Sequence, residues 1–165
     1  MKTIYLIGFM GSGKSSIGEC LSLLLDVPLI DTDAAVEEKY SQSIAAIFKE
    51  KGESTFRIYE SAALRDTPNT NAVVSTGGGI VENKGNTNYM KSGTVIYLHT
   101  SFHEIKRRLQ YDQKRPLWNS RLEEKEQLYK LRLNLYKSCA EYTISTDSKS
   151  IEAITNEIIA KIKHV

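Results

Sequence analysis

The sequence predicts an α/β protein in which a parallel sheet of about five strands is covered by helices on both faces. Short apolar stretches alternate along the chain with longer amphipathic stretches. The apolar stretches are continuous, which is typical of strands buried on both faces of a parallel sheet. The strands are expected at residues 3–7, 28–31, 72–75, 94–98 and 142–145.

The first strand and helix frame a glycine-rich turn. Residues 3–7 are apolar and mostly β-branched or aromatic, and this strand stops at Gly8. A helix is expected over 14–25, because apolar residues recur there at helical spacing. These residues are Ile17, Leu21, Leu24 and Leu25.

The middle of the chain predicts three helical stretches before the third strand. Two short helices are expected over 33–40 and 43–51, and Ser43 is a residue type that caps helix N-termini. A further helix is expected over 53–66. The third strand, 72–75, runs directly into a run of three glycines.

The last part of the chain predicts three helices and two loops. Helices are expected over 101–111 and 122–139, and a final helix carries one apolar face. That face consists of Ile151, Ile154, Ile158, Ile159 and Ile162. The segments 82–88 and 111–121 are expected to be loops, and a polar loop as long as the second is often a functional lid.

Length and composition indicate one soluble globular domain over residues 1–165. The chain is 41% apolar and 25% charged, and its net charge of +2 is too small to indicate nucleic-acid binding. No apolar run is long enough to cross a membrane, and there is no signal-peptide pattern. The two cysteines are far apart and do not cluster with the three histidines, so we expect reduced thiols and no zinc site. We expect a cytoplasmic monomer.

A phosphate-binding loop is indicated between the first strand and the first helix. The segment Gly8-Phe9-Met10-Gly11-Ser12-Gly13-Lys14-Ser15 has the full P-loop spacing, and Ser16 follows it. Glycines let backbone N–H groups approach phosphate oxygens, and the helix adds its positive end. We expect Lys14 to reach the β- and γ-phosphates of ATP and Ser15 to offer a hydroxyl to Mg²⁺. The motif alone fits GTPases, motor ATPases and kinases; the small size and the lack of an Asn-Lys-x-Asp guanine signature favour a small-molecule kinase.

Three further features follow or adjoin the predicted strand ends, where ligands bind in open α/β sheets. Asp31-Thr32-Asp33 follows the second strand, Arg57 lies in the next helical stretch, and Gly77-Gly78-Gly79 follows the third strand. A carboxylate can act on a substrate hydroxyl, an arginine can clamp a substrate carboxylate, and glycines admit a ligand close to the backbone. Each feature also has a structural alternative: a helix cap for either aspartate, a pair with Glu53 or Glu60 for Arg57, and a simple turn for the glycines.

These motifs together resemble the shikimate kinases, and the resemblance covers nearly the whole chain. The matching segments are the P-loop, Asp31-Thr32-Asp33, Ser43-Ile44-x-x-Ile47-Phe48, Gly52-Glu53-x-x-Phe56-Arg57-x-x-Glu60, Thr76-Gly77-Gly78-Gly79 and Arg115-Pro116-Leu117. The resemblance implies a three-layer P-loop NTPase fold of the nucleoside monophosphate kinase-like type. It also implies an acceptor-binding segment at about 33–60 and a lid at about 111–121. The chain departs from the family at Ile80, where a small residue is expected, and at Trp118, where an aliphatic residue is commoner. The larger Ile80 could tighten the pocket. Trp118 could alter lid packing, but the preferred interpretation is an aromatic residue that covers the base of the lid.

The resemblance implies a role for each site residue. Asp33, Arg57, Gly78, Gly79 and Arg132 would hold shikimate, with both arginines on its carboxylate. Gly11, Ser12, Gly13, Lys14, Ser15 and Ser16 would bind the ATP phosphates, and Ser15 and Asp31 would organise Mg²⁺. Arg115 would reach the phosphates from the lid, and Arg108, or its neighbour Arg107, would stack on adenine near Lys149. Lys14, Asp33 and Arg115 are the expected catalytic residues.

The implied reaction is transfer of the γ-phosphoryl group of ATP to the 3-hydroxyl of shikimate, in aromatic amino acid biosynthesis. The residue chemistry agrees, because shikimate carries one carboxylate and three hydroxyls. Asp33 either orients the attacking hydroxyl or accepts its proton. The alternatives are a kinase for another small hydroxy acid such as gluconate, and a nucleotide-binding protein without transfer activity.

Overall fold

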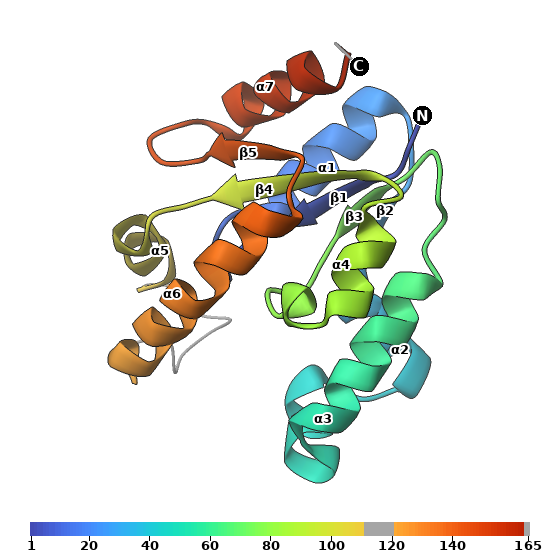
Figure 1. Ribbon diagram of the computed structural model, residues 1–165, viewed down its shortest axis with the longest axis vertical. Coiled ribbons are helices and arrows are strands. Elements are labelled where there is room, and N and C mark those ends of the chain that lie inside the picture. Colours follow the sequence, from blue (N-terminus) through green and yellow to red (C-terminus); the bar gives the residue numbers. More distant parts are fainter. Residues whose placement is uncertain (111–120, 164–165) are drawn as a thin grey trace.

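The computed structural model describes residues 1–110 and 121–163, and it contains the expected sheet of five parallel strands (Figure 1). The strands are β1 (Ile4–Ile7), β2 (Leu29–Asp31), β3 (Val73–Ser75), β4 (Thr94–His99) and β5 (Tyr142–Ser145). Their order across the sheet is β2-β3-β1-β4-β5. Because all strands are parallel, their carboxyl ends lie at one edge of the sheet, where Gly8 and Asp31 also lie.

Helices cover both faces of this sheet. They are α1 (Lys14–Leu25), α2 (Thr32–Tyr40), α3 (Ile44–Arg65), the 3₁₀ turn η1 (Ile80–Glu82), α4 (Lys84–Met90), α5 (Phe102–Leu109), α6 (Leu122–Cys139) and α7 (Ile151–Lys163). In the described part of the chain, no helix has both the length and the apolar character that a membrane crossing needs.

Alternate side chains of the central strand point into two separate cores. Ile4 and Leu6 of β1 face α1 and α7, whereas Tyr5 and Ile7 face α3, α4, α5 and α6. Figure 1 shows α1 and α7 together on one side of the sheet and α6 with α4 on the other. The continuous apolar strands therefore contribute side chains to the cores on both faces of the sheet, as a three-layer α/β fold requires.

A third, smaller core ties α2 to α3 beyond the edge of the sheet. It contains Val36, Ile47, Phe56 and Ala63, all buried. Ser43 caps α3, because its hydroxyl accepts a hydrogen bond from the backbone N–H of Ala46 at 3.1 Å. The two helical stretches expected on either side of Gly52 form one continuous element whose backbone breaks at that glycine, with φ of 82°. The break is compatible with glycine because φ is positive there.

The prediction of a loop at residues 82–88 is wrong. Residues 80–82 form a 3₁₀ turn and 84–90 form a helix. Asn83 caps this helix by accepting hydrogen bonds from the N–H groups of Gly85 and Asn86, at 2.7 and 3.3 Å. The side chain of Asn86 is buried and donates to the carbonyl of Ile80. Of the polar residues that suggested a loop, Asn83 caps a helix and Asn86 forms a buried hydrogen bond. The other expected loop, 111–121, lies almost wholly outside the described residues.

Candidate active site

A cavity of about 640 Å³ opens at the carboxyl ends of β1, β2 and β3, a size suited to small-molecule ligands. Its lining combines residues of the P-loop, the Asp-x-Asp segment, α3, the glycine triplet and α6. The predicted site residues on its wall are Gly11, Gly13, Lys14, Ser15, Ser16, Asp31, Asp33, Arg57, Gly78, Gly79 and Arg132. Apolar side chains complete the wall, including Phe48, Phe56 and Leu128.

The P-loop turns inward around the lysine that begins α1. Gly11 and Gly13 have φ of 78° and 92°, and Gly13 is the N-cap of α1, where a side chain would be strained. The Lys14 ammonium donates to the carbonyls of Gly8 and Phe9 at 2.8 and 3.0 Å. The lysine is therefore held over the loop whose N–H groups would receive phosphate oxygens.

The two aspartates that follow β2 have different surroundings. Asp31 is the N-cap of α2, and its Oδ1 accepts from the N–H groups of Asp33 and Ala34 at 2.9 and 3.1 Å. The capping alternative is therefore correct for Asp31. Asp33 lies in the first turn of α2, and its Oδ1 is buried without a hydrogen-bond partner among the described residues.

Burial raises the pKa of the Asp33 carboxyl above its ordinary value. The charge of Asp31 raises this pKa further, whereas Lys14 and Arg57 oppose the shift. A buried, unpartnered carboxylate oxygen at the cavity wall is suited to accept a hydrogen bond from a ligand hydroxyl.

Arg57 is surrounded by carboxylates on α3 and η1. Its Nη1 pairs with Glu60 at 2.9 Å, and its Nη2 lies 3.2 Å from Glu53 and 3.6 Å from Glu82. The guanidinium lies directly against Gly79, so closely that a Cβ on this glycine would overlap it. Arg57 therefore forms the predicted ion pairs with Glu53 and Glu60, and it also lines the cavity.

Arg132 reaches the same region from α6. Its side chain is 7% exposed, its Nε has no partner among the described residues, and its Nη2 pairs with Glu82 at 3.2 Å. One oxygen of Glu82 therefore lies within 3.6 Å of both guanidinium groups. The two predicted carboxylate-binding arginines, which are far apart in the sequence, are close enough for a single carboxylate to contact both.

Two glutamates adjoin these arginines. The sequence placed Glu60 only in the acceptor-binding segment and as a partner of Arg57, and it gave Glu82 no role. Glu60 is buried at 1% exposure, and burial raises its pKa although Arg57 opposes the shift. A Cβ on Gly77 would lie 2.6 Å from Glu60 Oε1 and 2.7 Å from Asp33 Oδ1. Two carboxylate oxygens that have no hydrogen-bond partner in the part of the chain that the structure describes therefore converge on this glycine. The signal for Glu60 was its place three residues after Arg57; Glu82 had none, because its segment was predicted to be a loop.

A second cavity, of about 390 Å³, lies on the other side of the P-loop. Ser12 lines it together with Gly11, Gly13, Ser16, Arg107, Arg108 and Lys149. Arg108 donates to the carbonyls of Gly11 and Thr146, at 3.2 and 3.1 Å, whereas Arg107 is 68% exposed. Glu104 contacts both arginines, and hydrogen bonds from Arg107 and then Arg108 lower its pKa to about 2.

Arg115, Trp118 and Ile80 are the remaining residues with an expected role or effect. Arg115 and Trp118 lie outside the described residues. Ile80 is fully buried in the core beneath α6 and α4 and does not line the main cavity, so the expected effect on the pocket is not seen.

Oxygen groups suited to Mg²⁺ are present beside the P-loop. Ser15 and Asp31 both line the main cavity, and magnesium sites with phosphate ligands need only one or two protein oxygens. The described residues hold no group of three or more histidine, cysteine or acidic side chains able to bind a metal. The donor set therefore fits a metal bound mainly through a nucleotide and water.

The fold and the site define a P-loop kinase for a small molecule. Comparison with known proteins gives the family. The shikimate kinase family model matches residues 10–163. A shikimate kinase from Bacillus cereus (strain AH187) is 43% identical over 164 residues, covering 98% of this chain and 99% of the relative.

Solved structures agree with this result. Shikimate kinase from Acinetobacter baumannii, in complex with shikimate, superposes with a TM-score of 0.92 at 33% identity, covering 99% of this chain and 94% of that one. A gluconokinase from Sinorhizobium meliloti has a TM-score of 0.62 at 16% identity, covering 99% and 92%, and shares the fold alone. The chain belongs to the shikimate kinase family, whose members are ATP-dependent kinases with an alcohol acceptor.

Proposed function

We propose that this chain transfers the γ-phosphoryl group of MgATP to the 3-hydroxyl of shikimate. The observation that carries the proposal is the convergence of Lys14, Asp33, Arg57 and Arg132 on one cavity. This set combines a phosphate-binding cation, a carboxylate for a hydroxyl and two cations for a carboxylate. Shikimate presents the matching groups.

The acceptor is held by charge and by close backbone approach. Arg57 and Arg132 bind its carboxylate, since charge-assisted hydrogen bonds from guanidinium groups suit that shape. Gly78 and Gly79 are the proposed backbone contacts of the acceptor, and the missing side chain of Gly79 leaves room for the Arg57 guanidinium. Asp33 accepts a hydrogen bond from the ring hydroxyl that will attack, either orienting it or taking its proton.

The phosphates are held on the opposite side of Lys14. The backbone of Gly11, Ser12 and Gly13 and the side chains of Ser15 and Ser16 receive them, while Lys14 turns from the loop carbonyls toward the β- and γ-phosphates. Ser15, with the help of Asp31, would hold Mg²⁺, which when bound would supply positive charge beside the phosphate oxygens. Phosphoryl transfer needs mainly such positioning and charge neutralisation.

Two further arginines complete the proposed nucleotide site. Arg108 contacts the base side of the nucleotide in the second cavity, and its bond to Gly11 supports this assignment. Arg115 is proposed as the lid residue that reaches the phosphates. Its role rests on the family motif.

A coupled assay for ADP release tests the proposed function. We expect shikimate-dependent turnover that requires both ATP and Mg²⁺. A panel including gluconate should show the highest kcat/KM for shikimate. ATP binding without transfer to any acceptor would refute the proposal.

The proposed cellular setting is a single-domain monomer in the cytoplasm that binds neither nucleic acid nor membranes. The small net charge of +2 supports the absence of a nucleic-acid role. Light scattering coupled to gel filtration checks the oligomeric state, with a mass near 18.6 kDa expected.

A further inference from the structure

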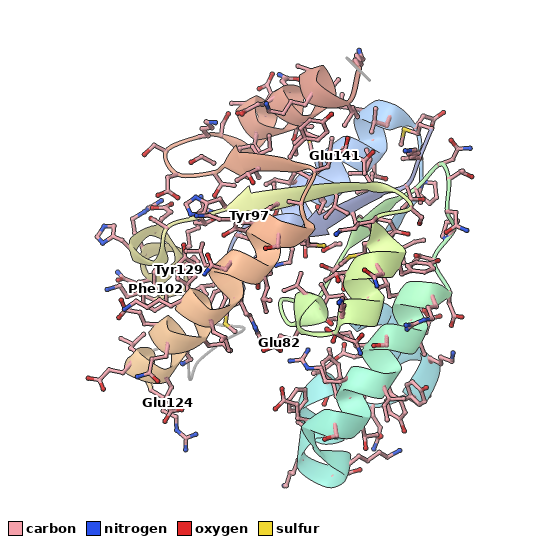
Figure 2. All side chains as sticks on the ribbon, viewed as in Figure 1. Glu82, Tyr97, Phe102, Glu124, Tyr129 and Glu141 are labelled. Carbon is pink, nitrogen blue, oxygen red and sulfur yellow. The ribbon has the colours of Figure 1, made fainter. Side chains whose placement is uncertain are left out.

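The carboxylate of Glu82 lies between the two arginines of the acceptor clamp, Arg57 and Arg132. Its Oε2 is 3.2 Å from Arg132 Nη2 and 3.6 Å from Arg57 Nη2. Figure 2 shows Glu82 in the space between α6 and the side of the molecule formed by α3 and α4. We propose that Glu82 is a built-in counter-ion that weakens the clamp and thereby sets its affinity for the acceptor carboxylate. This inference rests on the proposed function.

Arg57 does not depend on Glu82 for its position. Its Nη1 is paired with the buried Glu60 at 2.9 Å. Its guanidinium also lies against Gly79 and 5.3 Å from the centre of the Phe56 ring. These contacts hold the group on three sides, so the more distant Glu82 adds charge to it rather than orientation.

Arg132 is also held by the fold itself. Its side chain projects from α6 with only 7% exposed, and its guanidinium carbon lies 6.0 Å from the centre of the Phe9 ring. Among the described residues, Glu82 supplies its one ion pair. The effect of Glu82 on Arg132 is therefore mainly to offset its charge.

The location of Glu82 decides how it acts on a ligand. Arg57 and Arg132 both line the acceptor cavity, whereas Glu82 does not. An acceptor carboxylate and Glu82 therefore approach the guanidinium groups from different directions, and the charge of Glu82 stays nearby when the acceptor binds. In their charged forms, Glu53, Glu60 and Glu82 offset the charge of the two arginines before any acceptor anion arrives.

The sign of the effect follows from these charges. Removing one negative charge beside the clamp raises its positive potential and favours an anionic ligand. The Glu82 side chain is 32% exposed, so water screens part of the interaction. We expect Glu82→Gln to lower the shikimate KM by about three- to tenfold, the range for one partly screened charge near a protein surface.

The test is steady-state kinetics with shikimate varied at saturating MgATP. Glutamine keeps the size of Glu82 and an oxygen that accepts from Arg132, and it removes only the charge. We expect kcat and the ATP KM to change by less than about twofold, because the substitution leaves the phosphate site untouched. The gain in affinity should shrink as salt is added.

Two matched variants separate this effect from general ones. Glu141→Gln removes the same charge at an exposed position that Figure 2 shows well away from Glu82, and it should leave the shikimate KM unchanged. Glu53→Gln removes a carboxylate that is 62% exposed and that, within residues 1–110 and 121–163, forms an ion pair with Arg57 alone, so its effect should be smaller than that of Glu82→Gln.

The outcomes are distinct. A shikimate KM that is unchanged in Glu82→Gln would overturn the inference, and so would a raised KM, which would instead make Glu82 a support for the arginines. Either result leaves the proposed function standing, provided that the unmodified chain turns over shikimate. Absence of that turnover would overturn both.

Discussion

Replacing Arg57 with alanine tests the acceptor clamp most directly. The side chain would lose one or two charge-assisted hydrogen bonds to the acceptor carboxylate, each worth about 1.5–3 kcal/mol. Because Arg57 is 25% exposed, we take about 3 kcal/mol for the total, which corresponds to a rise of about 100-fold in the shikimate KM. The ATP KM should change little, since Arg57 does not line the second cavity.

The assay is coupled ADP release with shikimate varied at saturating ATP, and Arg65→Ala is the matched control. Arg65 lies on the same helix, is exposed and donates to the Ser61 carbonyl outside the cavity. Its replacement should leave both KM values within about twofold. An unchanged shikimate KM in Arg57→Ala would refute the clamp.

Stability must be separated from binding in this experiment, because Arg57→Ala leaves the buried Glu60 without its ion pair. Burial already raises the pKa of Glu60, and loss of Arg57, which opposes that shift, raises it further. A carboxyl whose pKa is raised by folding costs stability as the pH rises through that pKa. Arg57→Ala should therefore melt at a lower temperature at pH 8 than at pH 5. The double variant with Glu60→Gln should lose this dependence but keep the raised shikimate KM.

Three further changes probe the remaining parts of the site. Asp33→Asn should lower kcat by about 100-fold or more without lowering the melting temperature, and should remove the loss of activity at acid pH that protonation of Asp33 causes; retained kcat would mean a purely structural role. Gly77→Ala should lower kcat/KM by at least about tenfold, because the new Cβ would crowd Glu60 and Asp33; normal kinetics would show that both carboxylates can move aside. Glu104→Gln should raise the ATP KM several-fold by loosening Arg108, as measured by nucleotide titration; a selective rise in the shikimate KM would contradict this.

Much of the fold was predictable because local signals agreed with the tertiary structure. The bounds of α1, α6 and β5 are those that apolar periodicity and flanking residues predict. The helix that follows Asn83 was not predicted. A short segment rich in asparagine and glycine reads as a loop, and only the neighbouring backbone groups reveal it as a capped helix.

The site was predictable in its residue types more than in its contacts. The carboxyl ends of parallel strands brought Asp33 and the P-loop to one edge, as the topology requires. The meeting of Arg57 with Arg132 depends on how α6 crosses the sheet, which periodicity does not specify. Glu82 is harder still, because an exposed glutamate in a turn has no distinguishing pattern before its neighbours are placed.

The order of the strands also has a consequence for how the chain is made. β1 and β2 do not touch; β3, at residues 73–75, is the first strand that pairs with either, and it pairs with both. A growing chain that ends before β3 therefore has no strand pair, although α1 and α2 can already form. During synthesis, β1 and β2 should therefore remain unpaired until β3 has been made. Pairing of β3 with both strands should then start assembly of the sheet during translation.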